Sequence, residues 1–209
     1  MTLCEVLMVL GALGLLAVLF VTWSSHSLAR SIRLCCVNSL KQTGLAFNVW
    51  AGDNKGNFPM AISQTNGGTK EFTIGPNAYR HFQVVSNELS TPIVVVCPAD
   101  VRYGRKATNF INFGNSNISF FIGTDANTTN PNLILAGDRN LTNGTPIRNG
   151  ILELTTNNPA GWTAEMHKQV GNVVLSDASV QMVSIAGLRR AVENSGIVTN
   201  RLQIPILGL

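Results

Sequence analysis

Charged residues are scarce in this chain of 209 residues. Lysine, arginine, aspartate and glutamate make up only 12% of it, which is about half the share in a typical globular protein. The 15 basic and 11 acidic residues leave a formal net charge of +4. A nucleic-acid-binding face needs a denser basic surface with interleaved aromatic residues. We therefore expect no specific nucleic-acid partner. The length suits one good-sized domain with an appendage.

Basic residues are also missing ahead of the longest apolar run. Residues 6–21 read VLMVLGALGLLAVLFV and contain no charged or strongly polar side chain. Together with Thr22 and Trp23, this run is long enough to cross most of a ~30 Å hydrocarbon core as a helix. A cleavable signal peptide usually has lysine or arginine before its apolar stretch. The run therefore favours a membrane helix, although Ser27-Leu28-Ala29 also fits a signal-peptide cleavage site.

Glu5 is the only charged side chain ahead of that run. A simple membrane anchor has no use for it, because a carboxylate at the edge of a membrane helix is costly and usually has a partner. If Met1 is the true N-terminus, its ammonium group lies about one helical turn from Glu5. In a staggered stack of identical helices, the ammonium of one chain reaches Glu5 of the next. Such a buried pair sets the register more than it adds stability.

The N-terminal residues Met1-Thr2-Leu3-Cys4-Glu5-Val6-Leu7 resemble the processed N-terminus of type IV pilins and type II secretion pseudopilins. Mature chains of that family usually begin Phe-Thr-Leu-Ile-Glu and continue as an apolar helix. The resemblance implies that a prepilin peptidase removes a leader and that the new first residue, here Met1, is N-methylated. It also implies storage in the inner membrane, export by a pilus assembly machinery, and a helical homopolymer outside the cell. Gly11 and Gly14 lie where pilin helices commonly loosen inside filaments, and glycine weakens a helix.

A single stripe of apolar or small side chains follows the membrane segment in steps of three and four. It consists of Leu28, Ile32, Cys36, Leu40, Thr43, Phe47 and Trp50. This spacing is typical of one buried face of a helix, and the first strong stop is the turn sequence at residues 52–56. We expect one continuous helix of about 50 residues. Its residues 1–25 form the transmembrane or filament-core part, and residues 26–52 pack on a globular head of residues 53–209.

Short runs rich in valine, isoleucine and phenylalanine occupy the rest of the chain and predict β-strands. The predicted strands are Ile93–Val96, Ile118–Ile122, Leu133–Ala136, Ile151–Leu154, Asn172–Leu175 and Val180–Ser184. Residues 176–179 are expected to join the last two as a hairpin, and Ile185–Asn194 to form a short helix. Residues 61–91, and 123–150 outside the strand at 133–136, are expected to be loops. Strands that follow one long helix favour an α+β fold with an antiparallel sheet, the arrangement that a pilin fold has.

Further motifs are similar to those of pilin-like proteins of planctomycetes and verrucomicrobia. They are the sequences at residues 36–47 and 51–59, Cys97-Pro98-Ala99-Asp100, and scattered residues between Trp162 and Val180. This second resemblance implies a filament subunit or a pseudopilin and brings no catalytic residues with it.

The cysteines of the exported part predict a disulfide. Oxidising compartments favour disulfides, so one of the adjacent Cys35 and Cys36 is expected to bridge Cys97. Cys36 lies on the packed stripe of the helix and is the better partner. A zinc site at these cysteines is disfavoured, because the spacing does not fit and no histidine lies close in the sequence. Cys4 is interpreted as a small apolar residue of the membrane segment.

Two other groups of residues have a weak resemblance to functional sites. Asp53-Asn54-Lys55-Gly56-Asn57 looks like part of a calcium loop, but Lys55 occupies a ligand position and the bidentate glutamate is missing. We interpret it as a helix end and turn. His167, Asp177 and Ser176 or Ser179 suggest a hydrolytic triad, but no nucleophile elbow accompanies them. We expect no enzyme activity, cofactor or metal.

Four asparagines match the N-glycosylation sequence. They are Asn117, Asn127, Asn140 and Asn143. Asp125 and Asp138 precede Asn127 and Asn140 by two residues, a placement that bacterial oligosaccharyltransferases often prefer. We therefore predict glycans on the exposed surface.

Three functions remain open from the sequence. The first is a structural subunit of an extracellular type IV pilus-like filament that polymerises through its N-terminal helix, with Met1, Glu5, Gly11 and Gly14 as assembly residues. The second is a pseudopilin of a type II secretion system. The third, from a different class, is a periplasmic binding domain held by a single membrane span.

Overall fold

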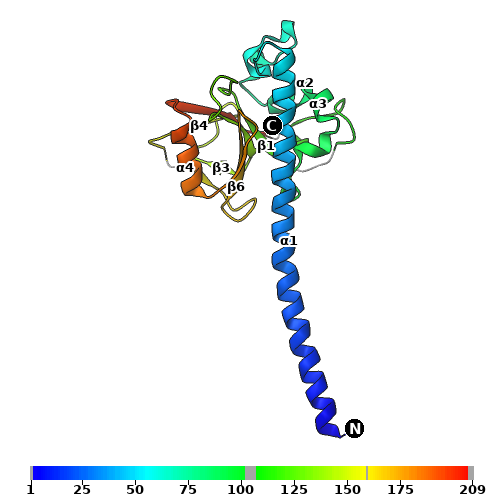
Figure 1. Cartoon of the computed structure of the whole chain (residues 1–209). Coiled ribbons are helices and arrows are strands. Elements are labelled where there is room, and N and C mark those ends of the chain that lie inside the picture. Colours follow the sequence, from blue (N-terminus) through cyan, green and yellow to red (C-terminus); the bar gives the residue numbers. More distant parts are fainter. Residues whose placement is uncertain (1, 102–106, 159, 207–209) are drawn as a thin grey trace. The chain divides into compact units, whose positions relative to one another are not determined.

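The computed structural model describes residues 2–101, 107–158 and 160–206, except for the side chains of residues 21–29. The chain forms two compact units, Met1–Leu34 and Cys35–Leu209. Helix α1 (Leu3–Asp53) runs through the first unit and into the second, and Figure 1 draws it in blue to cyan. The prediction of one helix of about 50 residues ending near Gly52 is confirmed.

The second unit is built on a six-stranded antiparallel sheet with the strand order β4-β8-β1-β2-β6-β7. A separate two-stranded sheet pairs β3 with β5. The protein is therefore α+β with an antiparallel sheet, as the sequence predicted. The strands are β1 (Phe120–Gly123), β2 (Ile134–Asp138), β3 (Leu141–Thr142), β4 (Ile151–Thr155), β5 (Gly161–Trp162), β6 (Gly171–Leu175), β7 (Val180–Val183) and β8 (Thr199–Gln203).

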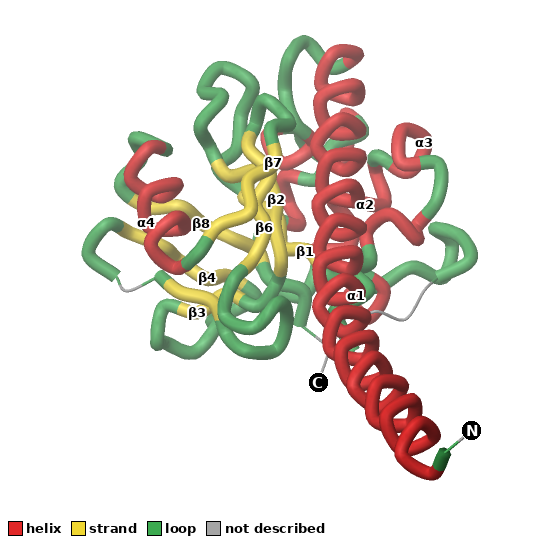
Figure 2. The backbone as a smooth tube through the Cα atoms, turned by 60° about the horizontal axis from the view of Figure 1, so that its bottom comes forward, coloured by secondary structure: helices red, strands yellow, loops and turns green. Residues whose placement is uncertain are grey.

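The sheet carries a hydrophobic core on each face, because successive side chains of a strand point to opposite faces. Phe120 and Ile122 of β1 belong to the cluster that includes α1, whereas Phe121 belongs to the cluster that includes α4 (Ile185–Asn194). Figure 2 shows the two helices on opposite sides of the strands. The second unit thus has three layers, with the C-terminal part of α1 over one face of the sheet.

The stripe predicted on α1 is buried in this unit. Its members there are Cys36, Leu40, Thr43, Phe47 and Trp50, while the side chain of Leu28 lies outside the described residues. The helix comes closest to the sheet at Gly44, where an added Cβ would lie 2.6 Å from Val174 Cγ2. Lys41 Nζ and Asn48 Nδ2 donate hydrogen bonds to the carbonyl oxygens of Ala178 and Ser176. The helix therefore holds the β6–β7 hairpin by its turn.

Four predicted strands match β2, β4, β6 and β7, and the run at 118–122 contains most of β1. The strand predicted at Ile93–Val96 is wrong, because this segment forms the 3-10 helix η4 (Pro92–Val95). Pro92 sets a helical φ at its first position, and Thr91 Oγ1 accepts a hydrogen bond from Ile93 N at 3.4 Å. The C-terminal helix was predicted with the bounds that it has in the structure.

The expected loop at 61–91 is also partly wrong. It contains α2 (Ala78–Val84), α3 (Ser86–Leu89) and the 3-10 helices η2 (Gln64–Asn66) and η3 (Lys70–Phe72), and η1 (Pro59–Ala61) ends at its start. Another 3-10 helix, η5 (Asn115–Asn117), precedes β1. These helices are too short for an amphipathic period to appear in the sequence. Contacts with the hydrophobic core stabilise these helices, and Ala78, Phe82 and Leu89 belong to that core.

Candidate functional site

The first candidate site is the apolar segment of the N-terminal unit. The 18 residues Leu3–Phe20 have a mean hydropathy of 2.5, and every one of them is exposed. At 1.5 Å per residue they extend about 27 Å, which is close to the ~30 Å of a hydrocarbon core. The structure therefore contains an N-terminal helix that is long and apolar enough to span a membrane. Exposure of so much apolar surface to water is unfavourable.

Glu5 is the carboxylate at the start of this segment, and in the single chain it caps the helix. Its Oε2 accepts a hydrogen bond from Thr2 N at 2.8 Å, while Glu5 N donates to Thr2 O at 3.0 Å. The carboxylate thus satisfies one of the amides that a helix N-terminus leaves without an internal acceptor. Met1 lies outside the described residues, so its pairing with Glu5 of a neighbouring chain stays a prediction.

Gly11 and Gly14 both lie within α1. Among the described residues, no atom outside the local helix backbone comes within 4 Å of a Cβ added at either position. Contacts within the described chain therefore give no reason for glycine here. Their role as assembly residues stays a prediction.

The second candidate site surrounds a buried disulfide. The sulfur atoms of Cys36 on α1 and Cys97 after η4 are bonded, the two Cα atoms lie 5.1 Å apart, and both residues are fully buried. The disulfide joins residues separated by 61 positions. Cys35, one position before Cys36 on the helix, points about 100° away from it. It is a free, exposed cysteine. The structure thus contains the predicted pairing and the predicted choice of Cys36.

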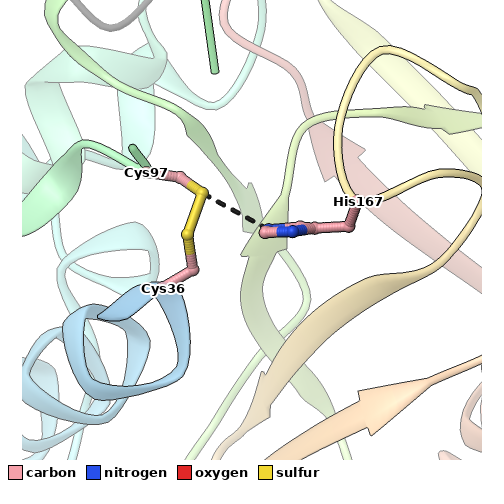
Figure 3. Close-up of side chains that lie close together, drawn as sticks. All are labelled: Cys36, Cys97 and His167. Carbon is pink, nitrogen blue, oxygen red and sulfur yellow. Dashed lines mark hydrogen bonds between the residues drawn. A yellow bond between two sulfur atoms is a disulfide. The ribbon is translucent and has the colours of Figure 1, made fainter. Parts of the chain in front are cut away.

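His167 lies against this disulfide, as Figure 3 shows. Its Nε2 atom is 3.3 Å from Cys97 Sγ and 3.6 Å from Asp138 Oδ2. The side chains of His167 and Asp138 are 3% and 0% exposed. The sequence missed this group and disfavoured metal ligation there, because His167 is 70 residues from Cys97. Only the spacing of the two cysteines was visible in the sequence.

The hydrolytic arrangement considered from the sequence does not form. Asp177 is exposed on the β6–β7 turn, and its Oδ1 accepts a hydrogen bond from Ser179 N at 2.8 Å. Hydrogen bonds from Ser179 hold the pKa of Asp177 below its ordinary value. The carboxylate that faces His167 is instead Asp138, which ends β2.

An unusual backbone turn presents His167 to the sulfur atoms. His167, Lys168 and Gln169 have φ angles of 50°, 53° and 64°, a left-handed conformation that costs about 1–2 kcal/mol for each non-glycine residue. Hydrogen bonds from Asn140 to the loop backbone offset this cost. Its buried Nδ2 group faces the carbonyl oxygens of Thr163, Met166 and Val170, at 3.0, 3.0 and 3.4 Å.

Arg139 fastens the two segments that carry Cys97 and His167. Its guanidinium donates two hydrogen bonds of 2.8 Å to Asp100 and one of 2.7 Å to Glu165. Burial alone disfavours the charged guanidinium, but the hydrogen bonds to the two carboxylates outweigh this and raise the pKa of Arg139. Asp100 follows Cys97 by three residues and Glu165 precedes His167 by two. One side chain therefore sets the position of both segments.

Asp138 is itself held in one orientation. Its Oδ2 accepts hydrogen bonds from the backbone N and the side-chain Nδ2 of Asn172, at 2.7 and 2.8 Å. Asn172 lies on β6, the strand next to β2. The result is a buried polar cluster of Asp138, Asn172 and His167 beside the disulfide.

Two predicted glycosylation sites are corrected by these contacts. Asn140 and Asn143 are 2% and 6% exposed, and the Nδ2 atom of Asn143 donates to Glu153 O at 2.8 Å. Neither amide nitrogen is accessible as an acceptor in the folded protein. Asn117 is half-buried, whereas Asn127 is exposed and its Oδ1 accepts hydrogen bonds from Thr129. Glycosylation of Asn117 and Asn127 stays a prediction.

The residues read as a calcium-like loop form the end of α1 and a turn. Gly56 N donates to Ala51 O at 2.8 Å, and Lys55 and Gly56 have φ angles of 58° and 76°. The helix therefore ends in residues with left-handed φ angles, which is a common type of helix C-terminus. The interpretation as a helix end and turn is confirmed.

Comparison with known proteins does not assign this chain to a family. No family profile matches it, and neither curated proteins nor solved structures gave a match.

Proposed function

We propose that this protein is a structural subunit of a type IV pilus-like filament that polymerises through its N-terminal helix. The observation that carries the proposal is the wholly exposed apolar segment Leu3–Phe20, headed by the carboxylate of Glu5. A membrane surrounds this segment before assembly, and neighbouring copies surround it afterwards. The second unit, with the rest of α1 over an antiparallel sheet, is compatible with a pilin-like fold.

Packing between copies accounts for the stability of such a filament. Each leucine or valine that becomes fully buried contributes about 1.5–3 kcal/mol relative to exposure in water. Helices leaving a membrane gain less from this source, since lipid is already apolar, and depend on close packing instead. Gly11 and Gly14 have no contact within the described chain that requires them. In the filament they allow a neighbouring helix to approach closely.

Glu5 sets the register of the stack in this proposal. The carboxylate exchanges its hydrogen bond from Thr2 N for an ion pair with the Met1 ammonium of the adjacent chain. A charge buried without its partner costs about 3–5 kcal/mol, so every other stagger is penalised. This step requires Met1 to be the processed terminus.

The other two functions share some of these features. A pseudopilin uses the same helix in a short periplasmic filament, so filament length and location separate it from a pilus. An anchored binding domain uses the helix only as a membrane span. It therefore predicts a functional monomer that is insensitive to replacement of Glu5.

The test replaces Glu5 with alanine in cells that assemble the filament. Surface-sheared material is examined by electron microscopy and the subunit is quantified in filaments and in membranes. We expect filament yield to fall by more than tenfold, while the Cys36–Cys97 disulfide and the circular dichroism of the detergent-extracted chain are unchanged. Glu193→Ala on α4 is the matched control, because Glu193 is an exposed carboxylate in the second unit.

Normal filament yield from the Glu5 variant contradicts the register mechanism. A wild-type protein that stays monomeric in the membrane, with no filament under any growth condition, refutes the filament function itself. Short filaments confined to the periplasm favour the pseudopilin.

A further inference from the structure

We propose that Cys36, Cys97 and His167 bind one Zn²⁺ ion when the disulfide is reduced. The second unit then exists in two covalently distinct forms, one bridged by a disulfide and one bridged by a metal. In both forms, the same two cysteines connect α1 to the segment after η4.

The donor set is the first reason for this inference. Thiolate sulfur and imidazole nitrogen are ligands that Zn²⁺ takes in proteins. The ligand atoms of Cys36, Cys97 and His167 all lie within 4.8 Å of one another. The three residues come from separate parts of the chain, so the fold and not a local motif brings them together.

The geometry is the second reason. With Zn–S distances of about 2.3 Å and a Zn–N distance of about 2.0–2.1 Å, a tetrahedral site has an S–N edge of about 3.5 Å. His167 Nε2 is 3.3 Å from Cys97 Sγ. The edge between Cys97 and His167 therefore exists already in the oxidised protein. Reduction has only to let the sulfur atoms separate to about 3.8 Å.

The surroundings resemble those that orient metal ligands. The ligands of a metal site are usually fixed by hydrogen bonds from residues behind them. Asn140 closes the loop that carries His167, and Arg139 joins that loop to the segment of Cys97. The left-handed backbone at His167 aims the ring at the sulfur atoms.

The reaction balances with a dithiol as reductant. The dithiol supplies two electrons and two protons, the bond between the Cys36 and Cys97 sulfur atoms breaks, and the reductant becomes a disulfide. Binding of Zn²⁺ then forms two Zn–S bonds and releases the two thiol protons. Metal affinity of the reduced protein therefore rises with pH.

The experiment uses the full chain in detergent. The protein is reduced without oxygen by a phosphine, in mild denaturant because both sulfur atoms are buried, and returned to buffer. Co²⁺ is titrated as a spectroscopic probe and Zn²⁺ is added in competition. We expect one Co²⁺ per chain, with thiolate-to-cobalt absorption in the near ultraviolet and tetrahedral bands in the visible, and complete displacement by Zn²⁺. The oxidised protein gives no thiolate absorption.

Two variants make the test specific. His167→Ala should weaken Co²⁺ binding by at least about tenfold, the lower end of what even supporting residues of a metal site contribute. Cys35→Ser is the matched control, because Cys35 is adjacent but exposed and outside the cluster, and it should bind like the wild type.

Three results overturn the proposal. The reduced wild type binds no Co²⁺, or it binds but His167→Ala binds equally well, or the reduced chain unfolds and Zn²⁺ does not restore its circular dichroism. A purely structural role for His167 beside the disulfide predicts the first of these.

Discussion

A buried histidine in the second unit predicts how the stability of this protein depends on pH. His81 on α2 is fully buried, with Nε2 2.7 Å from Gln203 Oε1 and Nδ1 2.7 Å from Thr69 Oγ1. Gln203 Nε2 donates to the carbonyl oxygens of Phe72 and Gly75, so Gln203 Oε1 is the acceptor for His81 Nε2–H. Thr69 then donates its hydroxyl proton to Nδ1. Both ring nitrogens of the neutral form are therefore hydrogen-bonded.

Burial lowers the pKa of His81 from 6.5 to about 4, although the hydrogen bond to Gln203 opposes the change. As the pH falls, the unfolded chain therefore takes up a proton at this site before the folded protein does. The contribution of His81 to stability is fully present above pH 6.5 and is lost as the pH falls towards 4. The gap of about 2.5 between the two pKa values, at about 1.4 kcal/mol per pKa unit, corresponds to a loss of about 3 kcal/mol.

The assay is urea unfolding of the full chain in detergent at several pH values from 7.5 to 4. His81→Gln is measured in parallel, since glutamine does not titrate. The other two histidines are present in both proteins, so the difference in pH dependence isolates His81. We expect the wild type to lose about 3 kcal/mol more than the variant over this range. Parallel curves for the two proteins would refute the assignment of a neutral, proton-excluding His81.

Two further predictions concern the residues around the disulfide. Asn140→Ala should destabilise the protein by about 1–3 kcal/mol, because it leaves the carbonyl oxygens of Thr163, Met166 and Val170 without their shared donor. Urea unfolding measures the change in the free energy of unfolding, and an unchanged urea midpoint would contradict the prediction. Gly137→Ala on β2 should cost about 1–3 kcal/mol by overpacking, because its Cβ would lie 2.7 Å from Asn172 O and from the Phe121 ring. Gly161→Ala is the control, since the nearest atom to its Cβ would be Thr142 Cγ2 at 4.0 Å. Equal thermal midpoints for the two variants would rule out the steric argument.

Local patterns in the sequence determined much of the architecture. The charge-free run and the stripe after it predicted α1, because helical periodicity depends only on neighbours three and four residues apart. Ser176–Ser179 predicted the β6–β7 hairpin for the same kind of reason, since a turn is set by a few adjacent residues. The choice of Cys36 over Cys35 also followed from the helical period.

Strand β8 shows the limit of what local sequence patterns can predict. Its residues Thr199–Gln203 are mostly polar and resemble a loop, yet the strand lies between β4 and β1 inside the sheet. Gln203 is buried there because it hydrogen-bonds His81, Phe72 and Gly75. Polar side chains occupy a core when distant partners satisfy them, and no short stretch of sequence reveals such partners.

The apolar N-terminal helix was therefore determined by the sequence, because it follows from the type and spacing of nearby residues. The sequence also predicted the disulfide, because it has few cysteines and Cys36 lies on the packed stripe of α1. The group around the disulfide was decided by the tertiary structure alone. His167 meets Cys97 across 70 residues and meets Asp138 from another strand. Asn140, which the sequence marked as a glycan acceptor, became the buried donor that closes the His167 loop. Contacts between distant segments depend on how the sheet and α1 pack, and no periodic pattern in the sequence predicts that packing.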